Sequence, residues 1–135
     1  MQRQNWRSWW KWILPVVLGL NGAVMMLAPA AWYPAVPGVI QTGPFNGHFI
    51  RDIGAANLAC AGGLGWWALD RKQVGAVFVA AVFLDLHAMI HLITPFAPGC
   101  GGRPVQDLAR DFAGVFLPAI IASLIVWRGL KRKEA

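Results

Sequence analysis

The chain has 135 residues, of which 57% are hydrophobic and 13% are charged, and its net charge is +6. A soluble domain usually carries about 25% charged residues, so this composition argues against a soluble globular protein. The basic residues lie at the ends of apolar segments and do not alternate with aromatic residues in a stripe, which argues against a nucleic-acid-binding module.

Four apolar segments follow one another along the chain, at about residues 13–33, 49–69, 74–95 and 108–127. Each has roughly 20 residues, enough for a helix to cross a hydrocarbon core of about 30 Å, and none alternates like a strand. The first has a basic front, but its apolar run is longer than the core of a signal peptide. We therefore predict an all-α protein, an integral membrane four-helix bundle in which residues 1–135 form a single transmembrane domain.

Lysine and arginine are distributed unevenly between the two sides of the predicted spans. The positive-inside rule places the richer side in the cytoplasm, and most tryptophans lie at that same boundary, as in an aromatic belt. We predict that both termini are cytoplasmic and that the membrane is the bacterial inner membrane. The rich side carries Arg3, Arg7, Lys11, Arg71, Lys72, Arg128, Lys131, Arg132 and Lys133, and the other side carries Arg51, Arg103 and Arg110.

The two halves of the chain resemble copies of one helical hairpin. Pro29 in the first span matches Pro95 in the third, and a loop rich in glycine and proline follows each of them. The next helix then begins with a polar residue and an Arg-Asp pair, at residues 48–53 and again at residues 107–112. Because both halves run in the same sense, we predict a parallel repeat whose axis lies along the membrane normal.

A short motif lies at the start of the second span. Residues 51–62 read Arg-x-x-Gly-x-x-x-Leu-x-x-x-Gly, after a span that ends in Ala-Pro and before a short basic turn. In this motif and in its four predicted spans, the chain resembles the DoxX-like group of small four-helix membrane proteins. Some members of that group are tied to quinone-linked sulfur oxidation, whereas the third span here carries histidines where members often have an arginine.

Ionisable residues inside membrane spans are costly, and each is a candidate functional residue. In this chain they gather in the outer halves of the second, third and fourth spans, together with all three histidines. The candidate ligand or proton site comprises Arg51, Asp52, Asp85, Arg110 and Asp111, beside Asp107, and the candidate metal ligands are His48, His87 and His91.

The histidine spacing suggests one chemistry for this cluster. His87 and His91 are four residues apart, so their rings share one helix face and can supply two ligands to one metal ion. His48 approaches from another helix at similar depth, and it could complete a three-histidine site or pair with one of the others across a haem. Proton transfer and contact with a quinone head group are further interpretations of the same cluster.

A purely structural interpretation is preferred over these roles. Arg51 and Asp111, or Arg110 and Asp52, can neutralise each other across the repeat axis without any ligand. Asp85 lies on a different helix face from the two histidines of its span, so we expect it to meet another neighbour, either Arg51 or Asn21.

The two cysteines and the known sequence motifs identify no reaction. Cys60 falls in the middle of the second span and Cys100 in a glycine-rich loop, so no internal disulfide is expected. Cys100 is then either a plain loop residue or an intermolecular disulfide or reactive thiol. No Walker A loop, dinucleotide fingerprint or C-x-x-C motif occurs.

Together these features favour an accessory or subunit-type membrane protein with a polar pocket near its outer face. Its expected partners are membrane lipid and either a larger membrane complex or further copies of itself, and not nucleic acid. One alternative is a redox or metal-dependent enzyme subunit that binds a metal ion, haem or quinone through His48, His87 and His91. The other is a proton or small-solute conduit through Asp85.

Overall fold

The computed structural model describes residues 6–97 and 103–134, and every element within them is helical, which confirms the all-α prediction. Cys100 and its glycine-rich loop lie outside the described residues, as does Arg3. In chain order the elements are η1 (Trp6–Trp12), α1 (Ile13–Leu27), α2 (Pro29–Ala35), η2 (Val39–Thr42), α3 (Gly47–Leu69), α4 (Val74–Ile93), η3 (Thr94–Phe96), α5 (Pro104–Asp111), η4 (Phe112–Phe116) and α6 (Leu117–Glu134).

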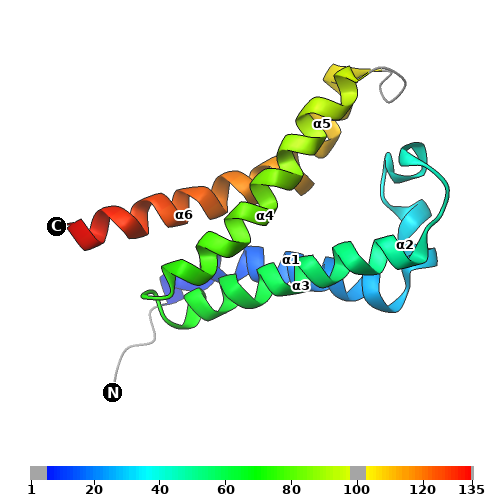
Figure 1. Cartoon of the computed structure of the whole chain (residues 1–135). Coiled ribbons are helices and arrows are strands. Elements are labelled where there is room, and N and C mark those ends of the chain that lie inside the picture. Colours follow the sequence, from blue (N-terminus) through cyan, green and yellow to red (C-terminus); the bar gives the residue numbers. More distant parts are fainter. Residues whose placement is uncertain (1–5, 98–102, 135) are drawn as a thin grey trace.

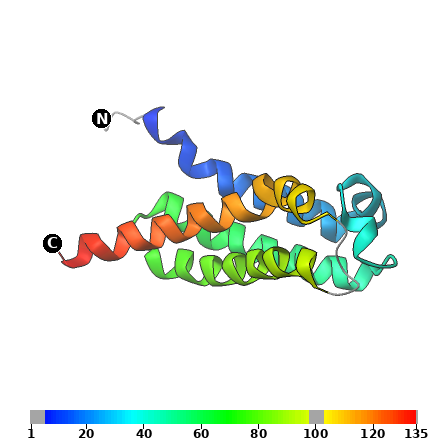
Figure 2. The same cartoon turned by 90° about the horizontal axis from the view of Figure 1, so that it is seen from above.

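The long helices form two hairpins, α1 with α3 and α4 with α6, and α3 packs on α4 to join them. Figures 1 and 2 show η1, the α3–α4 turn and the C-terminal part of α6 at one end, here called the terminal end. The segments α2, η2 and η3 lie at the opposite end, here called the loop end. Within the described part of the chain, α1 and α6 share no extended contact, so packing runs from neighbour to neighbour and does not form a closed ring.

Among the residues that the structure describes, three segments are long and apolar enough to cross a membrane: Trp9–Leu27, Val74–Phe96 and Pro104–Lys131. They are compatible with a small membrane protein. The predicted second span forms α3, which has 23 residues but is less apolar than the other three. Its first turns carry His48, Arg51 and Asp52, and Asn57 follows in its middle.

The predicted first span, residues 13–33, is not one continuous helix. It breaks at Ala28, whose φ and ψ of −137° and 54° are not helical, and α2 starts at Pro29. Proline disfavours the helical conformation in the residue before it, which is the physical reason for the break. The indole of Trp32 in α2 donates a hydrogen bond to the side-chain oxygen of Asn21 in α1 at 2.9 Å, so the two helices stay tied together.

Two glycines bring α1 and α3 into close contact. A Cβ atom at Gly22 would lie 2.7 Å from the backbone oxygen of Gly54, and one at Gly54 would lie 2.8 Å from the Cβ of Met25. Beside them Asn57, 8% exposed, donates a hydrogen bond to the backbone oxygen of Ile53 at 3.0 Å. The absence of side chains at both glycines therefore sets how closely these helices approach.

Aromatic and basic residues gather at the terminal end. The Arg71 guanidinium lies 3.8 Å from the ring centroid of Trp67 and 5.2 Å from that of Trp10. On α6 the Lys131 ammonium lies 4.2 Å from the ring centroid of Trp127. Cation–π contacts of this kind combine an apolar body with a charged tip, which suits a membrane–water boundary.

The α3–α4 turn is held by one carboxylate. Asp70 accepts hydrogen bonds from the backbone N–H of Lys72 at 3.0 Å and from the side-chain amide of Gln73 at 2.8 Å. The pKa of Asp70 lies below its ordinary value of 3.8, mainly because of the hydrogen bond from Lys72 and next because of that from Gln73. The ionised form is therefore the one that stabilises the turn.

The turn is expected to loosen in acid. Because the folded pKa of Asp70 is depressed, its carboxylate stabilises the α3–α4 turn fully above about pH 4. This stabilisation is lost as the pH falls through the folded pKa. Hydrogen exchange of the Lys72 amide in detergent micelles, corrected for its intrinsic rate, should lose protection over that range. Protection in Asp70→Asn should not change with pH there, and identical pH profiles in the two proteins would contradict the assignment.

Candidate functional site

A histidine and an aspartate pair at the loop end, where α4 meets α5. The Nδ1 atom of His91 lies 2.7 Å from Oδ2 of Asp111. An ionised carboxylate can only accept, so the ring nitrogen is the donor. The side chain of Asp111 is 12% exposed and that of His91 is 31% exposed, so the carboxylate is largely shielded while the imidazole is partly accessible.

Arg110 extends this pair along α5. Its Nε atom donates to Oδ1 of Asp111 at 3.0 Å, so both carboxylate oxygens of Asp111 are engaged. One terminal nitrogen of the same guanidinium lies 3.0 Å from Oδ1 of Asp107. We call His91, Asp107, Arg110 and Asp111 the loop-end network.

Gly38 connects the loop-end network to the other hairpin. Its φ is +88°, in the left-handed region that disfavours residues with a side chain, and a Cβ atom there would overlap the Arg110 guanidinium. The loop between α2 and η2 therefore lies directly against Arg110. The network thus joins α4, α5 and a loop of the first hairpin.

A column of rings on α4 leads up to the network. His87 stacks on Phe83, with ring centroids 5.8 Å apart and planes at 10°. The rings of His87 and His91 are 4.7 Å apart and tilted by 59°, as their spacing of four residues predicts. The side chains of Phe83, His87 and His91 are all partly buried.

A π-helix follows the network directly. In η4 the N–H of Leu117 bonds to the backbone oxygen of Phe112, five residues earlier. Such a turn holds one extra residue and is frequent at functional sites. It shifts the register between α5 and α6, so that Asp111 faces α4 while Ala119 and Ala122 pack in the hydrophobic core.

The structure does not bring His48, Arg51 and Asp52 to this network. The imidazole of His48 lies 3.5 Å from the Asp52 carboxylate one turn along α3, and both side chains are exposed. Arg51 donates to the backbone oxygens of Met26 and Gly47 at 3.2 and 3.4 Å. The predicted pairs of Arg51 with Asp111 and of Arg110 with Asp52 do not form, because each arginine finds its partners within its own hairpin.

The three histidines therefore do not converge. Among the residues that the structure describes, no group of three or more His, Cys, Asp or Glu side chains is arranged to hold a metal ion. His48 belongs to the first hairpin, and His87 and His91 belong to the second. Within the described residues, the predicted three-histidine metal site therefore has no support.

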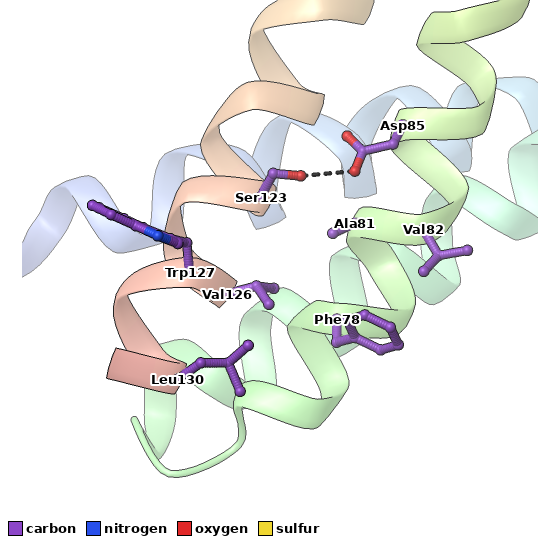
Figure 3. A pocket seen from close by; sticks show the side chains of 8 residues that line it. All are labelled: Phe78, Ala81, Val82, Asp85, Ser123, Val126, Trp127 and Leu130. Carbon is purple, nitrogen blue, oxygen red and sulfur yellow. Dashed lines mark hydrogen bonds between the residues drawn. The ribbon is translucent and has the colours of Figure 1, made fainter. Parts of the chain in front are cut away.

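Asp85 faces α6, and not Arg51 or Asn21 as predicted. The Ser123 hydroxyl of α6 donates a hydrogen bond to Oδ2 of Asp85 at 2.7 Å (Figure 3). The pair lines a shallow groove of about 240 Å³ between the two helices, whose other walls are apolar. Asp85 is exposed, so its carboxylate lies on the outside of the helix pair.

Sequence reasoning missed three residues that matter here: Gly38, Phe83 and Ser123. Gly38 follows a proline in a loop, which is typical of a turn, and Phe83 precedes His87 by four residues, which places both rings on one helix face. Both residues could therefore have been identified from neighbouring sequence. Ser123 carried none, because only the packing of α6 on α4 brings it to Asp85.

Searches against family models, curated proteins and solved structures found no match to this chain.

Proposed function

We propose that this chain is a non-enzymatic, subunit-type membrane protein that crosses the bacterial inner membrane four times with both termini in the cytoplasm. In this role the loop-end network holds the outer loops in one shape, and a partner in the membrane uses the helix faces. The positive-inside rule and the aromatic residues at the terminal end support the orientation. The fourth span would be α3, which lies between α1 and α4.

One observation carries the proposal: the loop-end network is satisfied by its own members. His91 and Arg110 both bond to Asp111, and Arg110 also pairs with Asp107. Across the described residues, no buried side-chain nitrogen or oxygen lacks a hydrogen-bond partner. A site that binds a substrate needs polar groups left free to meet it, so an internally paired network supports a structural role.

The grooves of the molecule support a partner and not a small substrate. One, of about 240 Å³, lies between α4 and α6, and another, of about 370 Å³, lies between α3 and α4. Apart from Asp85 and Ser123 in the first groove, both are lined by apolar and small side chains and open along the sides of the helices. Such faces suit another helix in a membrane.

A kinship with the DoxX-like group is part of the proposal. The residues that carry that resemblance, 51–62, all lie on α3, and Gly54 within them is the glycine that meets Gly22 of α1. A requirement for close helix packing accounts for that glycine without any redox chemistry.

Spectroscopy and native electrophoresis test this function. We expect the detergent-purified protein to show no visible absorption band and no stoichiometric metal, and to match a His87→Ala/His91→Ala variant in both. In mild detergent extracts of its native membranes, the chain should migrate in a larger assembly than when purified alone.

His48→Ala is the matched control, because His48 is exposed and lies on α3, in the other hairpin from His87 and His91. A haem band or bound metal that disappears in the double variant and persists in His48→Ala would overturn the proposal in favour of a redox or metal-dependent subunit. Migration as a single chain from native membranes would contradict the subunit role.

A further inference from the structure

Asp85 places an acidic group on the side of an otherwise apolar helix. It lies roughly 16 Å along α4 from Val74 and roughly 12 Å from Ile93, at about 1.5 Å per residue, and so near the middle of the predicted span. The residues around it on α4 are apolar except for the histidines further along. A carboxylate at this depth usually faces a partner or a water-filled cavity, because lipid solvates it poorly.

Within the described residues, Ser123 is the single hydrogen-bond partner of Asp85. Its hydroxyl occupies Oδ2, and no protein donor meets Oδ1 (Figure 3). No lysine, arginine or histidine of the described chain lies within ion-pair distance of the carboxylate. Within the described part of the chain, no basic side chain therefore balances the negative charge of Asp85.

The arginines in the predicted spans cannot supply the missing charge. Arg110 is held by Asp107 and Asp111. Arg51 is bonded to backbone oxygens and lies roughly 27 Å along α3 from Leu69, about 10 Å further from the terminal end than Asp85. A second copy in the same orientation would present Arg51 at the wrong depth. The balancing cation therefore belongs to a polypeptide of different sequence.

The groove around Asp85 has a shape and lining that suit a helix. Figure 3 shows the carboxylate and the Ser123 hydroxyl at one end, with apolar side chains below them. Ala81 and Val82 on α4 have short side chains, and the groove is open to the side, where an incoming helix could pack. Its apolar walls are formed by Phe78, Ala81, Val82, Val126, Trp127 and Leu130.

We propose that the α4–α6 groove is the docking surface for a membrane-spanning helix of another polypeptide that carries a lysine or arginine at the depth of Asp85. The cation pairs with the free oxygen of the carboxylate, and the rest of the helix packs on the apolar walls. The inference rests on the subunit role proposed above and names the chemistry of the partner. The strength of such a pair comes from the low dielectric around it, where an unpaired charge is costly.

A synthetic transmembrane helix tests the docking surface directly. Two probes are used, each a leucine–alanine helix without tryptophan and labelled with dansyl at one end. The lysine probe carries one lysine at its centre, and the leucine probe carries leucine at that position. The full chain is reconstituted in phosphatidylcholine vesicles, and energy transfer from its tryptophans to dansyl is measured as probe is added. We expect the lysine probe to bind at least tenfold more tightly than the leucine probe.

Variants of the chain locate the effect. Asp85→Asn should remove the preference for the lysine probe, whereas Asp52→Asn, an exposed aspartate on α3, should keep it. Val82→Trp fills the groove at an exposed position without touching the charge, and it should weaken binding of both probes. Equal binding of the two probes to the unchanged chain, or a preference that survives Asp85→Asn, would overturn the proposal.

Two further outcomes separate this inference from the proposed function. If the chain migrates in a native assembly but shows no preference for the lysine probe, the docking surface is wrong and the subunit role stands. The unchanged chain could instead form dimers in vesicles, and Asp85→Asn could dissociate these dimers. The occupant of the groove would then be a second copy, which overturns the assignment to a different polypeptide.

Discussion

Gly22→Ala is expected to destabilise the protein by about 1–3 kcal/mol, the usual cost of overpacking a close contact. The new Cβ atom would lie 2.7 Å from the backbone oxygen of Gly54, 3.0 Å from Cγ of Leu58 and 3.1 Å from Cβ of Asn57. A backbone oxygen cannot swing aside as a flexible side chain can, so α1 and α3 must separate. Unfolding in mixed micelles of dodecyl maltoside and SDS, followed by circular dichroism, measures the loss.

Gly62→Ala is the matched control, because Gly62 is also a helical glycine and a Cβ atom there would meet nothing within 4 Å. Alanine favours a helix over glycine by about 1 kcal/mol, so this change should be neutral or stabilising. The two substitutions are chemically identical, yet only Gly22→Ala should destabilise the protein. Equal effects would show that helix propensity, and not the α1–α3 contact, decides stability at Gly22.

Asp111→Ala is expected to lower the stability of the fold by about 2–3 kcal/mol, because it removes one acceptor shared by two donors. His91 would lose its partner at 2.7 Å, and Arg110 would keep only Asp107. Since Arg110 packs against Gly38, the loop between α2 and η2 should loosen as well. The same mixed-micelle unfolding measures the first effect, and proteolysis of the outer loop measures the second.

Asp52→Ala provides the comparison from the equivalent motif of the first hairpin. The pair that it breaks, His48 with Asp52, has side chains 89% and 61% exposed and 3.5 Å apart, so the loss should stay below about 1 kcal/mol. If Asp52→Ala and Asp111→Ala cost the same, the loop-end network does not hold α4, α5 and Gly38 together, and its structural role fails.

Features encoded by neighbours along the chain could be predicted from the sequence. Apolar segments of about 20 residues predicted the long helices, and the spacing of His87 and His91 predicted adjacent rings, which lie 4.7 Å apart. Pro29 lies near the end of the predicted first span, and the break before it shows how a single residue acts locally. The intrinsic geometry of a helix carries this information, so no tertiary contact is needed to infer it.

Tertiary structure alone decided which polar groups meet. The two Arg-Asp motifs look alike in sequence, yet Asp111 is largely enclosed by α4 and Arg110, whereas Asp52 stays exposed at the start of α3. Ser123 reaches Asp85 only because α6 packs on α4. Contacts between helices depend on their relative rotation and approach, which are set by close packing such as that of Gly22 on Gly54, and helical periodicity within one segment does not contain that information.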